Sequence, residues 1–287
     1  MNPFVDLDDP AVVAAAQGGD RDALTVVIER HRPWVYNIAV RMMGDPGSAE
    51  DATQDIFIKV LRRISSFEGR SSFRTWLYRV AFHHLLNAKR SRGEEHHTTF
   101  DQYAAGLQGA PDLGLDDIPV PERELLVEEA MTACMTGMLL CLNRDQRLAY
   151  VLGSVFDISD TMAAEILDVA PATFRKRLQR AREDLHNFMN GNCGLINEDN
   201  PCRCARKTRA FMSAGFVDRN DLKFQRDRVA SIDQVASRDA AVVYDKLTND
   251  YPALYRKHSF SDPQQLAQRL STMLQDTALG GLLPSSD

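Results

Sequence analysis

The sequence predicts an all-α protein with two small helical domains, an acidic linker between them and a mostly helical C-terminal extension. Apolar residues recur at three- and four-residue intervals through most of the first 190 positions, which is the spacing of helices with one buried face. Turns rich in glycine and proline separate these stretches. The pattern is interrupted between 93 and 121, where acidic residues dominate. We therefore expect domains at 1–92 and 122–190, a linker at 93–121 and an extension at 191–287.

Composition and charge fit a soluble protein that contacts nucleic acid locally. Of the 287 residues, 44% are hydrophobic and 26% charged, as in globular domains. The formal net charge is −6, but between Gly93 and Leu142 the only cation is Arg123. Without this segment the chain is slightly basic, and local patches decide nucleic-acid contact.

The sequence indicates a cytoplasmic location. Met1–Pro10 is acidic and does not resemble a signal peptide, and no run approaches the ~20 apolar residues of a membrane span. An odd number of cysteines, five, argues against a disulfide framework and for a reducing compartment. We expect no membrane insertion.

Two helices are predicted before the central part of the first domain. Asp9–Gln17 forms the first, and the turn Gly18-Gly19-Asp20 ends it. The second runs from about Asp22 to Met43. Pro33 lies inside it, so we expect a kink or a boundary there.

The run from Ala49 to Arg92 organises the first domain. Its first half has an apolar stripe at helical spacing, formed by Ile56, Phe57, Val60, Leu61 and Ile64. Asp51, Gln54 and Asp55 stand at i, i+3 and i+4 and share a polar face. After a turn at 68–72, Ser72 is placed to cap a second helix from Phe73 to about Lys89.

Aromatic and basic residues are interleaved where these two helices meet. This combination suits single-stranded nucleic acid, because bases stack on the rings, at ~1–3 kcal/mol per base, while cations hold the backbone. The alternative is a hydrophobic staple, and some of the rings must belong to the core; we expect Trp76, the fourth residue of the helix, to be the core member. The residues concerned are Phe67, Phe73, Trp76, Tyr78, Arg70, Arg74 and Arg79.

The second domain contains a predicted helix-turn-helix. Glu122–Leu142 is helical, and Asn143 can cap the next helix, from Arg144 to Phe156. A further helix at 159–167 is followed by Asp168, which can adopt the left-handed conformation of the turn. Pro171 then opens the last helix.

This last helix has one buried stripe and one basic face. The stripe consists of Phe174, Leu178, Ala181 and Leu185. A short side chain at the N-terminus with Arg and Lys beside it suits entry into a major groove, where phosphate contacts flank base contacts. The outward residues are Ala172, Thr173, Arg175, Lys176, Gln179 and Arg180.

Two motifs resemble one family. The patterns "AED-x-x-Q-D-x-F" and "F-x-G-R-S-S-F-R-T-W-L-Y-R" resemble region 2 of bacterial RNA polymerase sigma factors of the short extracytoplasmic-function group. The helix-turn-helix resembles region 4 of the same family. Together the resemblance covers about residues 9 to 190.

The resemblance implies a transcription initiation factor, which is not an enzyme and requires no cofactor. It would bind core RNA polymerase at the β′ coiled coil and the β flap, and promoter DNA at the −10 and −35 elements. Asp51, Gln54 and Asp55 would dock on polymerase. For −10 binding and melting it implies Phe67, Arg70, Ser71, Phe73, Arg74, Trp76, Arg79, His83 and Asn87. For −35 binding it implies Ala172, Thr173, Arg175, Lys176, Arg177, Gln179 and Arg180.

The resemblance leaves one position open and gives the acidic linker a role. Many family members have Asn where this chain has His83, so its −10 preference does not follow from the resemblance. In the family the equivalent linker threads the polymerase active cleft, so the resemblance implies that Asp112, Asp116 and Asp117 occupy channels built for nucleic acid; the alternative is an inert tether.

The extension contains a cysteine group with several interpretations. His186, Cys193, Cys202 and Cys204 could complete a tetrahedral zinc site. A redox dithiol and plain buried cysteines are the other interpretations. A basic cluster, Arg203, Arg206, Lys207 and Arg209, is expected in solvent or, alternatively, on a phosphate or acidic partner. Helices are expected at about Ser231–Leu247 and Ser261–Gln275.

Two other functions remain as alternatives. One is a stand-alone helix-turn-helix repressor, which would have no use for the aromatic loop or for the Asp51 face. The other is a metal- or redox-responsive regulator acting through the extension, in place of or beside an anti-sigma protein. The sequence shows no nucleotide-binding loop, nucleophile elbow or HExxH motif.

Overall fold

The computed structural model describes residues 10–89, 91, 94, 99–224, 255, 260 and 263–275. Within these residues the regular structure is helical, with one isolated bridge between Cys193 and Cys202, so the all-α prediction is confirmed. No described helix is both long and apolar enough to cross a membrane. The predicted helix at Ser231–Leu247 lies outside the described residues.

The N-terminal body contains the first four α-helices. They are α1 (Pro10–Gln17), α2 (Arg21–Met43), α3 (Pro46–Arg63) and α4 (Phe73–Asn87), with the 3-10 turn η1 (Ile64–Ser66) after α3. Aspartates begin two of them: Asp20 Oδ1 accepts from Ala23 N at 2.9 Å, and Asp45 Oδ2 accepts from Ser48 N at 2.8 Å. Gly44, with φ of 71°, ends α2 in the left-handed conformation.

Pro33 does not divide α2. The helix runs through it as one element, and the interpretation of Pro33 as a boundary is wrong. Trp34, Val35 and Ile38 immediately after the proline are buried in the core. This burial offsets the hydrogen bond that proline removes.

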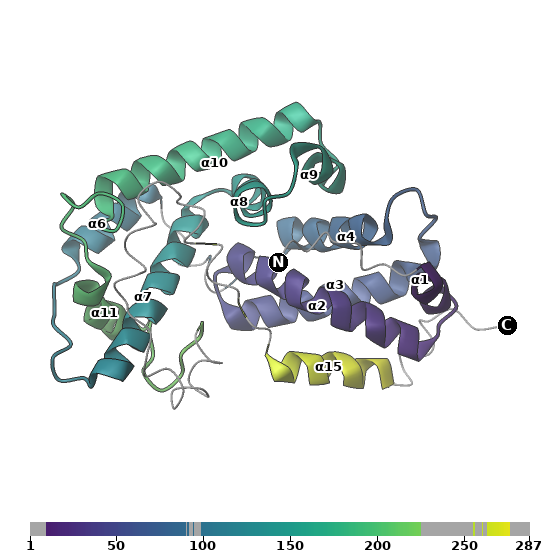
Figure 1. Cartoon of the computed structure of the whole chain (residues 1–287), viewed down its shortest axis with the longest axis horizontal. Helices are drawn as coiled ribbons and strands as arrows, with labels where there is room; N and C mark the ends of the chain where they lie inside the picture. Colours follow the sequence, from purple (N-terminus) through teal and green to yellow (C-terminus); the bar gives the residue numbers. More distant parts are fainter. Residues whose placement is uncertain are drawn as a thin grey trace.

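The second body is larger and includes the helix-turn-helix (Figure 1). It is built from α6 (Phe100–Gly109), α7 (Val120–Cys141), α8 (Arg144–Tyr150), the π-helical turn η2 (Val151–Val155), α9 (Asp160–Leu167), α10 (Pro171–Asn192) and α11 (Cys204–Ser213). The remaining helix, α15 (Gln264–Gln275), lies against α2 and α3 of the first body, on the side away from α4.

Helix α6 lies in the segment expected to be an irregular linker. A capping box starts it: Thr99 Oγ1 accepts from Gln102 N at 3.3 Å, and Gln102 Oε1 accepts from Thr99 N at 3.1 Å. Tyr103 Oη then donates to Cys134 O at 3.0 Å, which joins α6 to α7. The acidic composition of the segment concealed this local helix signal.

A buried ion-pair network joins the two bodies. Glu94 is 4% exposed and accepts hydrogen bonds from Arg144 Nε and Arg147 Nη1, each at 2.9 Å. Arg147 also donates to the carbonyl oxygens of Met42, at the end of α2, and of Leu142, at 3.0 Å from Nη2. The network therefore fixes α8 beside the C-terminal end of α2.

Candidate nucleic-acid and protein interfaces

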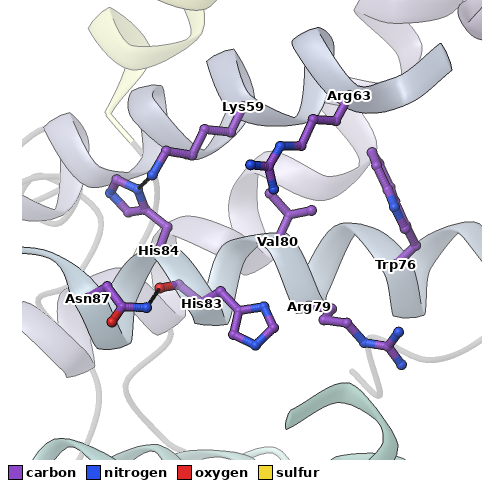
Figure 2. Close-up of a pocket in the computed structure, with 8 residues that line it drawn as sticks. All are labelled: Lys59, Arg63, Trp76, Arg79, Val80, His83, His84 and Asn87. Carbon is purple, nitrogen blue, oxygen red and sulfur yellow. Dashed lines mark hydrogen bonds between the residues drawn. The ribbon is translucent and has the colours of Figure 1, made fainter. Parts of the chain in front are cut away.

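A groove with basic and aromatic walls lies between α3 and α4. Figure 2 shows Trp76, Val80 and His84 directed from α4 toward Lys59 and Arg63 of α3. The three α4 residues stand at i, i+4 and i+8 and so share one side of the helix. An aromatic ring beside two cations can stack an unpaired base and hold its phosphate.

The aromatic residues at the start of α4 differ from our expectation in which ring is buried. Phe73 is 4% exposed and belongs to the core, whereas Phe67 and Trp76 are half-buried. The rings of Phe67 and Trp76 lie 5.7 Å apart, and each is within 5.6 Å of the Phe73 ring. The expectation that Trp76 is the core member is wrong, because its side of α4 faces the groove.

The other predicted −10 residues are placed unevenly. Arg70 is exposed in the turn and pairs with Glu68 at 2.5 Å, and Ser71 Oγ donates to Ser72 O at 3.2 Å in the same turn. Arg74 is buried and does not reach the groove surface. Arg79 Nη2 donates to Glu165 O of α9 at 2.9 Å.

Two neighbouring histidines of α4 have different surroundings. His83 is exposed and extends away from α3, and its carbonyl oxygen accepts from Asn87 Nδ2 at 2.7 Å (Figure 2). His84 Nδ1 lies 2.7 Å from Lys59 Nζ. Burial lowers the pKa of His84, the charge of Lys59 lowers it further, and Asp55 acts in the opposite direction. His84 is therefore neutral near pH 7.

The helix-turn-helix forms as predicted. Ser159 caps α9, its Oγ accepting from Met162 N at 3.4 Å, and Asp168 is left-handed with φ of 53°. Pro171 is the first residue of α10. The stripe of Phe174, Leu178, Ala181 and Leu185 is buried, as predicted.

Most of the predicted −35 residues lie on the free face of α10. Those that are exposed are Ala172, Thr173, Arg175, Lys176, Gln179 and Arg180. Arg177 instead turns toward α8 and pairs with Asp145 at 3.3 Å. Arg175 lies 3.8 Å from Asp160, near the start of α9.

The acidic face of α3 is in contact with the C-terminal extension. Arg269 of α15 donates to Asp51 Oδ1 at 3.0 Å and to Gln54 Oε1, and it lies 3.7 Å from Glu50. Asp55 is exposed at the other edge of this face, where its carboxylate lies 4.0 Å from His84 Nε2. Glu50 was not among the predicted residues, although it belongs to the same AED motif.

The cysteines near the end of α10 gather without forming a metal site. Cys193 and Cys202 pair through the isolated bridge, and Cys134 of α7, which the sequence analysis did not select, lies near them and Cys204. His186 is exposed. Among the described residues no group of three or more His, Cys, Asp or Glu side chains is arranged to hold a metal ion.

The electrostatics of these thiols also favour the protonated form. Burial raises the pKa of Cys204 to about 12, and the neighbouring Cys193 and Cys202 act in the same direction. Burial also raises the pKa of Cys193 and of Cys202. Metal ligation and thiol oxidation need the thiolate, so these thiols are protonated unless a bound metal ion lowers their pKa. The zinc or redox site stays a prediction.

The linker acids pair with the basic cluster of the extension. Lys207 Nζ lies 2.9 Å from Asp112 Oδ1, and Arg209 pairs with Asp117. Asp116 lies 3.8 Å from Arg123. The expectation that the whole basic cluster is in solvent is wrong for Lys207, which is buried.

The chain is similar in sequence to known sigma factors. The Sigma-70 region 2 family matches residues 27–95. The ECF RNA polymerase sigma-E factor of Haemophilus influenzae is 32% identical over 183 residues, which cover 63% of this chain and 95% of that protein. The RNA polymerase sigma-H factor of Pseudomonas aeruginosa is 32% identical over 179 residues, covering 61% of this chain and 90% of that protein.

One more sigma factor and one solved structure are also similar to the chain. The sigma-E factor of Escherichia coli K12 is 31% identical over 182 residues, covering 63% of this chain and 94% of that protein. The solved structure of CnrH in complex with the cytosolic domain of CnrY aligns with a TM-score of 0.46 and 22% identity, covering 64% of this chain and 97% of CnrH. On the sequence identity and coverage of its relatives, the chain belongs to the extracytoplasmic-function (ECF) RNA polymerase sigma factors.

Proposed function

We propose that this chain binds core RNA polymerase in the bacterial cytoplasm, directs it to promoters and helps to melt the −10 element. The observation that supports this best is the presence in one chain of a basic and aromatic groove on α4 and an exposed basic face on α10. A stand-alone repressor would need only the second. The relatives are transcription factors, and we propose no catalytic role.

We propose four functional segments with the boundaries predicted from the sequence. Residues 1–92 act as region 2, 93–121 as the linker, 122–190 as region 4 and 191–287 as a regulatory extension. The family match over 27–95 supports the first assignment. The helix-turn-helix of α9 and α10 supports the third.

At the −10 element, the groove beside α4 receives an unpaired base. Phe67 and Trp76 supply the stacking surface, because both rings are partly open to solvent. Lys59 and Arg63 hold the phosphates from the α3 side. Arg70 and Ser71 lie in the turn that borders the rings and would contact the strand next to that base.

At the −35 element, the first two turns of α10 enter the major groove. Thr173 and Arg175 stand near the helix start and contact base edges. Lys176 and Arg180 are exposed and contact phosphates. Arg177 supports the helix through Asp145 and makes no base contact.

The −10 and −35 contacts cannot form at the same time in the arrangement that the structure shows. Helix α9 packs on α4, and Arg79 is bonded to α9 through Glu165. The two promoter elements are nominally 25 base pairs apart, which is on the order of 80 Å along the duplex. Regions 2 and 4 must therefore separate when the protein engages a promoter on polymerase.

The polymerase contact uses Asp51, Gln54 and Asp55 on the β′ coiled coil, and region 4 on the β flap. An anti-sigma protein would be a further partner of the same surfaces. The test of the function is run-off transcription with core polymerase and a promoter selected from random sequence. Transcription by the wild type and its loss in Asp51→Arg with Asp55→Arg is the expected result.

Control measurements separate this result from misfolding. Both aspartates are exposed, so the double variant should unfold at the wild-type urea concentration. A folded double variant that binds polymerase normally in a pull-down would refute the assignment of this face. A wild type that binds duplex DNA but never supports transcription would favour the repressor.

A further inference from the structure

The C-terminal helix α15 covers part of the acidic face of α3. Its apolar residues Leu266, Leu270, Met273 and Leu274 recur at helical spacing and are buried in the core that α2 and α3 share. A helix with one apolar stripe docks by burying that stripe. The packing therefore holds α15 in a fixed position beside α3, and Arg269 lies at the edge of that contact.

Two residues of the extension that precede α15, Tyr255 and Phe260, also contact α2. Phe260 N donates to Asn37 Oδ1 at 2.8 Å, and Asn37 Nδ2 donates back to Phe260 O at 2.5 Å. The guanidinium of Arg41 lies 4.7 Å from the centre of the Phe260 ring and donates to Tyr255 O at 3.0 Å. Tyr255 and Phe260 are thus held on α2 by buried, specific contacts.

Arg269 meets the residues that the polymerase contact requires. Its guanidinium bonds Asp51 and Gln54 and approaches Glu50. A basic side chain on polymerase would need the same oxygen atoms. The two cations cannot occupy one carboxylate in the same geometry, so docking of α15 and docking of polymerase exclude each other at this face.

We propose that α15 is an intramolecular competitor of RNA polymerase, with Arg269 in the position that a polymerase cation takes on Asp51 and Gln54. This inference rests on the proposed function of the acidic face. The Asp51 side chain remains 74% exposed, whereas that of Glu50 is 13% exposed. The ion pair is therefore exchangeable, and burial of the apolar stripe holds the helix in place.

Competition lowers the apparent affinity for polymerase by the fraction of molecules in which α15 is released. If about one molecule in a hundred has α15 released, affinity is reduced about 100-fold. Arg269→Glu places a negative charge against Asp51 and Glu50 and so favours release. We expect it to tighten binding to core polymerase about 10-fold or more.

Arg219→Glu is the matched control. Arg219 also belongs to the extension and forms an exposed ion pair, with Glu122 at 2.7 Å from Nη2, on the other body. The change in net charge is the same, but no contact with α3 is involved. Its affinity for polymerase should equal that of the wild type.

A second variant and a second measurement cover the case in which the apolar stripe holds α15 without Arg269. Leu270 of α15 is fully buried in the core that α2 and α3 share, so Leu270→Asp should release the helix and tighten binding further. Circular dichroism then checks that the other helices remain. In the wild type, hydrogen exchange of the α15 amides should accelerate when core polymerase is added.

The outcomes distinguish this inference from the proposed function. If Asp51→Arg with Asp55→Arg loses polymerase but Arg269→Glu and Leu270→Asp bind no better than wild type, α15 is not a competitor. Unchanged protection of α15 on polymerase binding would lead to the same conclusion. If the aspartate variant binds normally, the assignment of the acidic face fails first.

Discussion

Replacing Glu94 by Gln should weaken the contact between the N-terminal body and the second body. It should also remove the contribution of Glu94 to the pH dependence of the unfolding free energy. Glu94 accepts from Arg144 Nε and Nη2 at 2.9 and 2.5 Å and from Arg147 Nη1 at 2.9 Å. The substitution keeps the size of the side chain but leaves two guanidinium groups without their counter-charge. Breaking a buried pair in this way costs about 3–5 kcal/mol of unfolding free energy.

The pKa of Glu94 gives a second magnitude of the same order. Burial alone would raise this pKa, but the hydrogen bonds from Arg144 and Ser91 N and the charge of Arg147 lower it from 4.5 to about 2. A carboxylate with a depressed pKa in the folded state stabilises the protein above its unfolded pKa. The difference corresponds to about 3 kcal/mol, which is lost as pH falls from about 4.5 to 2.

Urea unfolding at several pH values between 7 and 3 measures both effects. At pH 7 the wild type should exceed Glu94→Gln by about 3 kcal/mol, and by pH 3 this difference should shrink to roughly half. Glu122→Gln is the control, because Glu122 pairs with Arg219 at the surface and should change little. A gap between wild type and Glu94→Gln that stays constant from pH 7 to 3 would refute the ionised, paired state of Glu94.

Three further predictions concern the DNA-binding surfaces and the cysteines. Phe73→Ala should cost about 3–5 kcal/mol as a buried cavity, measured by urea unfolding, whereas Phe67→Ala should mainly lose −10 opening in permanganate footprints. Footprints of Phe67→Ala that match those of the wild type would contradict this division. Arg175→Ala should relax one −35 position by ~1–3 kcal/mol in a binding selection, whereas Lys176→Ala should lower the salt slope by ~1 for all sequences alike. A selection that returned the wild-type −35 preference for Arg175→Ala would reassign Arg175 to the backbone. Elemental analysis of the reduced protein and transcription by a Cys193, Cys202, Cys204 triple Ser variant test the predicted zinc or redox site. Absence of metal, together with unchanged transcription by the variant under reducing and oxidising conditions, would rule that site out.

Much of the local structure could be predicted from the sequence. The caps at Ser72, Asn143 and Ser159 and the left-handed Asp168 occur where their residue types indicated. These features depend on hydrogen bonds between residues three or four positions apart, so the local sequence is enough to specify them. The buried stripe of α10 follows for the same reason.

The same local rules misplaced features that depend on neighbours in space. Periodicity along α4 does not say which side meets α3, so Trp76, expected in the core, lines the groove, and Phe73 is the buried ring. Cys134 is 59 positions before Cys193 in the sequence, and only the docking of α7 against α11 brings it to the other cysteines. Pro33 is tolerated because of the core around α2.

The sequence by itself determined most of the helices and the helix-turn-helix, but not α6 or the burial of Phe73 and Arg74. The tertiary structure alone decided which of these surfaces are occupied by the chain itself. Arg79 meets Glu165 across 86 positions, and Arg269 meets Asp51 across 218. Such contacts depend on how whole helices bury their apolar faces against one another, a property of the assembled core that no short stretch of sequence contains.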